Sequence, residues 1–311
     1  MILNWNPETT DRNVREILRT LGEEYPLRES KEKINLIFEK NEDPMILRVT
    51  KRADSWIVSY GRDSLAARGA AYALSGQECD EKTPFKTFGI LFDCTRGNVI
   101  TVRHFKHWLR RLALMGYNMA MLYTKDAYQL PGEPYFGYMR GAYSMEEIKE
   151  IDAYAKKLRI EMIGSIQVLG HLEPILRWQA YWPVRDTSSA VLIDEPQTYE
   201  LLEKMIKFWS EALSSRRIHL GMDECQDLGR GRFMNQHGYE SQFDLYNRHL
   251  GRVCKICDKL KLKPIIWSDM YFRYANPNQV YYDTQAKIPD EVKKAIPKMV
   301  QFSYWDYYHR E

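Results

Sequence analysis

Residues 88–124 read FGILFDCTRGNVITVRHFKHWLRRLALMGYNMAMLYT, and this stretch decides the fold because it contains a strand, a helix and a second strand in succession. The apolar runs FGILFD and NMAMLYT at its two ends have the length of buried strands. The predicted helix between them has an apolar face formed by Val102, Phe105, Leu109 and Leu112. Gly116 stands where a C-terminal cap belongs. A strand, a helix and a strand in this order predict two parallel strands joined by a helical crossover.

The same alternation continues along the chain. Ser144 and Glu147 have the spacing of a capping box and predict the start of the next helix. Six strands and their helices fit an open doubly wound sheet or part of a (β/α)8 barrel. No glycine-rich phosphate loop follows the first strand, which weakens the case for a doubly wound sheet that binds a dinucleotide. The four later strands are predicted at EMIGSIQ (161–167), IHLGMD (218–223), KPIIWSD (263–269) and MVQFSYWD (299–306).

The division of side chains between strand faces favours the barrel. Ile218, Leu220 and Met222 share one apolar face of their strand. The opposite face is mixed and ends at Asp223, and the strand at 299–306 shows a similar division. An apolar face suits packing under helices, whereas the mixed face suits the inside of a barrel whose mouth is a site. We therefore predict an α/β fold, a TIM-type (β/α)8 barrel that is incomplete, with about six βα units.

The residues before this barrel predict a small α+β domain. Residues 14–21 have helical periodicity, and residues 64–74 form a helix of small residues. The polar segment SGQECDEKTPFK (75–86) is interpreted as the linker. The predicted domains are therefore 1–82 and 83–311, and the strands of the first are INLIF (34–38), MILRV (45–49) and WIVSYG (56–61).

Composition narrows the class of protein. The 311 residues are 44% hydrophobic and 28% charged, with a formal net charge of +3 spread along the chain. This balance gives no reason to expect nucleic acid or a membrane as partner. Five cysteines at scattered positions fit a reducing compartment, and the N-terminus has no signal-peptide pattern. We expect a cytoplasmic protein of unknown oligomeric state.

Polar or aromatic side chains stand at or just after the end of every predicted strand of the barrel. In a barrel of this type the carboxyl ends of the strands converge on one face, where active sites are built. The alternative is that loops are polar in any case. These residues are Asp93, Arg96, Asp126, His171, Asp223, Glu224, Trp267, Asp269, Trp305 and Asp306.

The adjacent acids Asp223 and Glu224 are the most informative members of this set. In an unbroken strand Glu224 would point outward, so we expect the chain to bend at Asp223 and bring both side chains to the mouth. Two carboxylates in different environments can take different protonation states, and such pairs are typical of glycoside cleavage. Trp267 and Trp305 would supply flat walls for a sugar ring, although core tryptophans are commoner.

Several motifs together resemble glycoside hydrolase family 20, the β-N-acetylhexosaminidases. HLGMDE (219–224) is similar to the catalytic signature of that family, and the small α/β unit is similar to its usual N-terminal domain. The motifs occur in family order over nearly the whole chain. The others are DCTRG (93–97), YFGYMRGAYSMEEIKEIDAYA (135–155), LGHLEP (169–174) and YWDYYH (304–309).

The resemblance implies a role for each carboxylate. Glu224 would be the general acid/base, and Asp223 would hold the 2-acetamido group of the substrate. The acetamido oxygen would then attack the anomeric carbon, so that no enzyme nucleophile is needed. The substrate would be a terminal β-linked GlcNAc or GalNAc of a small molecule or an oligosaccharide. No metal or organic cofactor is implied.

The resemblance also assigns the surrounding residues. Arg96 would match an arginine that grips sugar hydroxyls, and His171 with Asp126 would match the polar pair that tunes the general acid. Trp267 and Trp305 would match aromatic pocket walls. Asp306 and Tyr307 lie in a matching motif without an assigned role.

One feature departs from the family. Its members close an eight-stranded barrel, and here the last predicted strand is the sixth. We therefore expect the 311-residue chain alone to have little activity and to self-associate through unpaired edges. The rival interpretations are a barrel hydrolase for another sugar and a non-catalytic carbohydrate-binding protein.

Two weaker motifs remain. Cys254 and Cys257 form CKIC without the second ligand pair that structural zinc requires. The tyrosine-rich segment 123–143 is either a binding rim or a packed surface loop.

Overall fold

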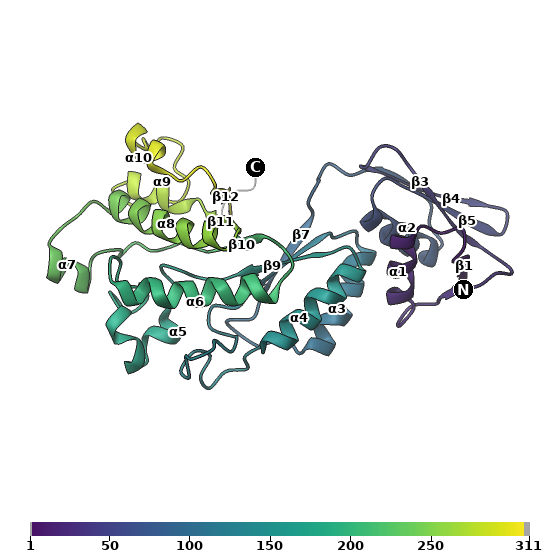
Figure 1. The fold of residues 1–311 in the computed structure, drawn as a ribbon. Coiled ribbons are helices and arrows are strands. Elements are labelled where there is room, and N and C mark those ends of the chain that lie inside the picture. Colours follow the sequence, from purple (N-terminus) through teal and green to yellow (C-terminus); the bar gives the residue numbers. More distant parts are fainter. Residues whose placement is uncertain (1, 308–311) are drawn as a thin grey trace. The chain divides into compact units, whose positions relative to one another are not determined.

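The structure is a computed structural model and describes residues 2–307 (Figure 1). The chain forms two compact units. The first unit contains all of the predicted N-terminal domain and also parts that the sequence assigned to the barrel. It comprises the chain up to Phe92, Ile100–Met121 and Lys149–Met162, and the second unit comprises Asp93–Val99, Leu122–Ile148 and the chain from Ile163 onward.

A four-stranded mixed sheet forms the centre of the first unit. Its order is β3-β5-β4-β6, with β3 parallel to β5 and the other two pairings antiparallel. Helix α2 (Asp63–Ser75) packs on this sheet so closely that a Cβ on Gly69 would lie 2.3 Å from Val58. The small residues of this helix thus permit the close approach. The strands are β3 (Leu36–Lys40), β4 (Ile46–Arg52), β5 (Ser55–Tyr60) and β6 (Cys79–Lys82).

Strand β6 corrects the interpretation of residues 75–86 as a linker, because Cys79–Lys82 pairs along β4. The segment is an edge strand with no fully buried side chain, so it lacks the apolar alternation that marks a strand. The sequence also did not predict a two-stranded parallel sheet near the start of the chain. It consists of β1 (Leu3–Trp5) and β2 (Leu27–Glu29), with helix α1 (Arg12–Leu21) between them in sequence.

The predicted alternation of strands and helices produces one six-stranded sheet in the order β12-β11-β10-β9-β8-β7. The strands therefore lie in sequence order, and β9 through β12 pair in parallel. The sheet curls as half of a barrel, which confirms the α/β class. The strands are β7 (Gly89–Asp93), β8 (Met119–Tyr123), β9 (Glu161–Ser165), β10 (Arg217–His219), β11 (Lys263–Trp267) and β12 (Gln301–Ser303).

Local capping explains where the long helices begin. The N–H of Ser144 donates to Glu147, and the N–H of Glu147 donates to the Ser144 hydroxyl, which confirms the predicted capping box of α4. Thr101 caps α3 by accepting from the His104 N–H. The other helices include short ones in the loops after the strands. They are α3 (Val102–Leu114), α4 (Met145–Lys157), α5 (Glu173–Leu176), the 3-10 helix η1 (Gln179–Val184), α6 (Pro196–Ala212), α7 (Arg232–His237), α8 (Gln242–Lys259), α9 (Asp269–Ala275) and α10 (Asp290–Ala295).

Several strands are shorter than the sequence predicted, and the difference is largest for β10 and β12. Strand β10 ends at His219 because the backbone turns left-handed at Gly221 and Met222, each with a φ of 68°. Strand β12 ends at Ser303, so Trp305 and Asp306 lie in the loop after it. Apolar alternation continues into both loops, which explains why the sequence could not locate these ends.

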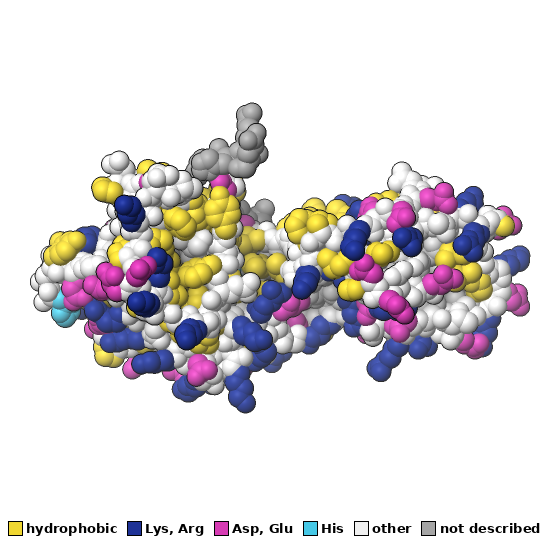
Figure 2. All heavy atoms as spheres, turned by 90° about the horizontal axis from the view of Figure 1, so that it is seen from above, with side chains coloured by type: hydrophobic (Ala, Val, Ile, Leu, Met, Phe, Trp, Pro, Cys, Tyr) yellow, Lys and Arg dark blue, Asp and Glu magenta, His cyan; other side chains and the backbone are white. Residues whose placement is uncertain are grey.

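Strand β12 is an edge of the six-stranded sheet, and the apolar rings of Phe302 in the strand and of Tyr304 just after it are exposed. Figure 2 shows hydrophobic side chains gathered on the second unit where β12 lies. Phe302 packs edge-on against Tyr271 of α9 and is still 42% exposed, and Tyr304 is 63% exposed. The apolar face predicted for residues 299–306 is therefore covered only in part. No helix within residues 2–307 is long and apolar enough to cross a membrane.

Candidate active site

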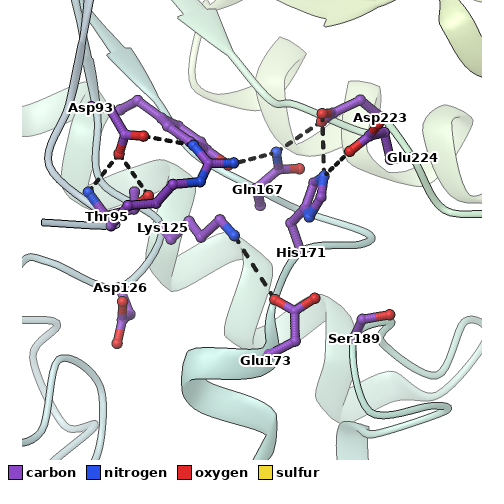
Figure 3. Close-up of polar contacts among 12 residues, drawn as sticks. Asp93, Thr95, Lys125, Asp126, Gln167, His171, Glu173, Ser189, Asp223 and Glu224 are labelled. Atoms are coloured by element: carbon purple, nitrogen blue, oxygen red, sulfur yellow. Dashed lines mark hydrogen bonds and ion pairs between the residues drawn. The ribbon is translucent and has the colours of Figure 1, made fainter.

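The carboxyl ends of the strands bring their polar side chains together within the second unit (Figure 3). Asp93 ends β7 and accepts two hydrogen bonds of 2.7 Å from the backbone and hydroxyl of Thr95. Its other oxygen accepts from Arg96 at 2.6 Å. Burial alone would raise the pKa of Asp93, but these hydrogen bonds outweigh it and lower the pKa. Asp93 thereby holds the guanidinium of Arg96, although most of the Arg96 side chain is exposed.

The turn after β10 carries the two adjacent acids. Left-handed backbone at Gly221, Met222 and Glu224 replaces the expected bend at Asp223, so the chain turns two residues earlier than predicted. Such backbone is strained for residues other than glycine and persists only where the surroundings hold it. The Met222 N–H donates to Gln167 Oε1 at 3.1 Å, and the Met222 carbonyl accepts from Tyr246 at 3.0 Å. These two buried contacts hold the turn.

Gly221→Ala should destabilise the protein by about 2–5 kcal/mol. Left-handed backbone costs an L-residue roughly 1–2 kcal/mol, and overpacking adds about 1–3 kcal/mol. The new Cβ would lie 2.1 Å from Gln167 Oε1. Denaturant unfolding followed by tryptophan fluorescence measures the change. Gly132→Ala is the matched control, because Gly132 has a φ of 80° with nothing within 4 Å of its Cβ position. Equal losses in the two variants would contradict the packing argument.

Asp223 is held between two donors. Gln167 Nε2 donates to Asp223 Oδ1 at 2.8 Å, and His171 Nε2 lies 3.3 Å from Oδ2. Burial alone would raise the pKa of Asp223, but the contacts with His171 and Gln167 outweigh it and lower the pKa. The hydrogen bond to Asp223 in turn raises the pKa of His171 against the effect of burial. Asp223 is therefore an ionised acceptor in a fixed orientation.

Glu224 shares His171 with Asp223 but has a more open environment. Its Oε2 lies 3.3 Å from His171 Nε2, and Oε1 accepts a hydrogen bond from the Tyr281 hydroxyl. Its side chain is 33% exposed, against 15% for Asp223. The Glu224 N–H donates to Asp269 Oδ2 at 3.1 Å. The more exposed Glu224 can therefore contact a ligand at the opening of the site, whereas the more buried Asp223 can contact only a ligand group that lies deeper in the site.

Asp269 lies beneath this pair at the start of α9 and is fully buried. Burial, with a contribution from the charge of Asp223, raises its pKa to about 6. The hydrogen bond from the Glu224 N–H opposes this shift. Asp269 thus fixes the backbone of Glu224 rather than contacting the open side of the site.

Asp126 lies apart from the carboxylate pair. Its Oδ1 is 3.0 Å from Arg140 Nη1, and Figure 3 shows no contact between Asp126 and His171. Arg140 also donates to the Thr95 carbonyl. Burial raises the pKa of Asp126 even though Arg140 opposes the shift. The structure therefore pairs Asp126 with Arg140, and the expected pairing of Asp126 with His171 is not among the contacts of residues 2–307.

Both predicted aromatic walls are partly exposed rather than fully buried. The ring of Trp267 lies over His219, with centroids 4.4 Å apart. Trp305 packs edge-on against Tyr281, with centroids 4.8 Å apart. Because Tyr281 also donates to Glu224, Trp305 is connected to the acid pair through one residue.

Sequence reasoning did not assign roles to Gln167 or Tyr281. Gln167 is the last residue of a predicted strand, and this position could have marked it as a candidate site residue. Amides at strand ends are common, however, so the position alone does not distinguish it. Tyr281 lies in residues 276–289, which have no periodic pattern and no helix or strand. Asp306 accepts from Tyr304 at 2.6 Å. Tyr308 and His309 of the YWDYYH motif lie outside the described residues.

One group of side chains could hold a metal ion within residues 2–307. Ligand atoms of His171, Asp223 and Glu224 lie within 4.8 Å of one another. Each of these atoms already has a hydrogen-bond or ion-pair partner inside the protein. Cys254 and Cys257 are both buried on α8 and belong to no such group in that range.

Comparison with known proteins identifies relatives of this chain. The family model "Glycosyl hydrolase family 20, catalytic domain" matches residues 116–306. Hexosaminidase D of Homo sapiens is 24% identical over 204 residues, covering 62% of this chain and 39% of that protein. Hexosaminidase D of Bos taurus is 26% identical over 186 residues, covering 56% of this chain and 51% of that protein.

Solved structures share the fold. The exo β-N-acetylglucosaminidase of Vibrio harveyi in complex with N-acetylglucosamine superposes with a TM-score of 0.76 at 16% identity. The match covers 98% of this chain and 54% of that one, so the chain spans about half the length of the proteins it resembles. Because the family model covers more than half of the residues, this chain belongs to glycosyl hydrolase family 20.

Proposed function

We propose that the protein is an exo-acting β-N-acetylhexosaminidase that hydrolyses terminal β-linked GlcNAc or GalNAc with retention of configuration. The observation that carries the proposal is the sharing of His171 by two adjacent carboxylates in different environments. Family membership supports the hydrolase class, and the relatives named above are hexosaminidases.

The proposed first step uses both carboxylates. Asp223 accepts a hydrogen bond from the acetamido N–H of the substrate, which directs the acetamido oxygen at the anomeric carbon. As the bond from that oxygen to C1 forms, the glycosidic C1–O bond breaks and Glu224 donates its proton to the leaving oxygen. In the second step water attacks C1, Glu224 takes up a proton, and the cyclic intermediate opens.

The other residues have supporting roles in this proposal. Arg96, anchored by Asp93, binds sugar hydroxyls. Trp267 and Trp305 contact the faces of the ring, and Tyr281 orients Glu224.

The identity of the 2-substituent tests the proposal. The intact protein should hydrolyse an aryl N-acetyl-β-glucosaminide far faster than the matching β-glucoside, by about 10⁵-fold or more in kcat/KM, because the glucoside lacks the attacking group. Steady-state kinetics with both compounds measure the ratio. Comparable rates would identify another kind of barrel hydrolase, and sugar binding without turnover of either compound would identify a carbohydrate-binding protein.

A further inference from the structure

A groove in the second unit has lining residues of which only Arg140 was described with the site above. Its volume is about 360 Å³. Its walls come from the loops that follow β8 and β9, on the same side of the sheet as the carboxylate pair. The lining residues are Arg140, Glu173, Pro174, Arg177, Arg185 and Ser188.

Two of the three arginines in this groove form no ion pair within residues 2–307, although the nearby charge of Arg177 opposes the rise in the pKa of Asp126. Arg140 is paired with Asp126. Arg185 donates through Nε to the Thr187 carbonyl, which leaves the charge of its guanidinium unbalanced. No ion pair within residues 2–307 involves Arg177 or Arg185. The acid of the groove, Glu173, lies 3.8 Å from the ammonium of Lys125, so the local charge is positive.

Aromatic side chains stand beside these charges. The Arg177 guanidinium lies 4.7 Å from the ring centroid of Trp178. Tyr138 packs edge-on against Trp178 at 5.2 Å, and Tyr135 lies 6.1 Å from the same ring. Both tyrosines are more than 40% exposed, although each carries a large apolar ring. The tyrosine-rich segment 123–143 therefore presents rings that could contact a sugar beside a positive groove.

The groove adjoins the carboxylate pair through one loop. His171, which contacts Glu224, and Glu173, which lines the groove, are two residues apart in sequence. Figure 3 shows Glu173 below His171, facing Lys125. A substrate whose scissile oxygen lies at Glu224 would extend its leaving group toward neighbouring surfaces of this kind.

We propose that this groove binds an anionic leaving group, namely a sugar that carries a carboxylate or a sulfate. Arginine is suited to this because its guanidinium donates two parallel hydrogen bonds to such a group. The inference rests on the proposed function, because it assigns the far side of the same scissile bond. It defines the substrate class as a terminal HexNAc linked to an acidic sugar.

Two disaccharides that differ only at C6 of the second sugar test the proposal. They are GlcNAc linked β-(1→4) to glucuronic acid and GlcNAc linked β-(1→4) to glucose. At low ionic strength kcat/KM of the intact protein should be about tenfold higher for the acid, as expected for one charge-assisted contact. The preference should shrink as salt screens these partly exposed charges.

Substitutions of the groove arginines test whether the preference for the acidic disaccharide arises in the groove. Arg177→Gln and Arg185→Gln should each bring the ratio of the two kcat/KM values toward one, whereas Arg185→Lys should retain part of it. Lys207→Gln removes a charge from an exposed ion pair on α6 of the same unit and should leave the ratio unchanged. A ratio near one in the wild type, or an equal loss in the Lys207 variant, would overturn the proposal.

A binding measurement separates this proposal from the proposed function. Calorimetry with the same two disaccharides on a Glu224→Gln background, which should bind them with little hydrolysis, should show tighter binding of the glucuronic acid compound, and adding Arg185→Gln should remove the difference. If neither compound is hydrolysed but this binding difference appears, the proposed function fails and the anion groove stands. If the neutral compound is hydrolysed and no binding difference appears, the groove assignment fails alone.

Discussion

Glu224→Gln should lower kcat on a natural β-N-acetylhexosaminide by about 10²–10⁴-fold while the affinity for GlcNAc changes little. Glutamine has nearly the same shape and can still accept from Tyr281, but it has no proton to give to the leaving oxygen. Steady-state kinetics and calorimetric binding of GlcNAc to the intact protein measure the two quantities. Glu203→Gln, on the exposed surface of α6, is a control that should retain full activity.

The leaving group provides a second check on the role of Glu224. A nitrophenyl leaving group is a weak base and needs little protonation, so its hydrolysis should suffer much less than that of a disaccharide. Equal losses with good and poor leaving groups would show that Glu224 does not act as the acid.

Asp223→Asn should lower kcat by about 10²–10³-fold, the range found when one preorganised partner of a transition state is removed. The carboxylate stabilises positive charge that develops as the acetamido group cyclises, so the loss concerns the transition state more than bound substrate. Inhibition constants measure this difference. A cyclic thiazoline mimic should lose far more affinity than GlcNAc, and parallel losses for both ligands would contradict the assignment.

The same variant has an effect that does not depend on activity. The contact with Asp223 is the main cause of the raised pKa of His171. Removing the negative partner leaves burial, which acts in the opposite direction, so the pKa of His171 should fall in Asp223→Asn. An NMR titration of the imidazole measures this pKa, and a value unchanged from wild type would show that the two side chains do not interact in solution.

The inner strands β8 to β11 could be predicted because most of their residues are buried, which makes parallel strands nearly continuous apolar runs. All six strands form where the sequence indicated. The ends of β10 and β12 could not be predicted, because Leu220 and Met222 remain apolar and fully buried after the strand has ended. Strand β6 was not predicted because its sequence is polar. An edge strand needs backbone pairing on one side but no apolar face.

The acids of the site could be predicted because adjacent charges at the end of a buried strand are costly without a purpose. Their orientation depends on Gln167, which contacts both the Met222 backbone and the Asp223 carboxylate. No local pattern reveals that one amide connects two strands. The contact of Asp126 with Arg140 likewise could not be predicted, because Arg140 lies in a loop with no periodicity.

The order of the strands in the six-stranded sheet has a consequence for how the protein is made. Each strand from β8 to β12 lies beside the one that precedes it in sequence. A nascent chain leaving the ribosome can therefore add each new strand to an edge that already exists, with no later strand inserted between earlier ones. The residues of the site are also synthesised in a fixed order. Gln167 and His171 are synthesised before Asp223 and Glu224, so the donors that orient the carboxylates can be in place when the two acids emerge.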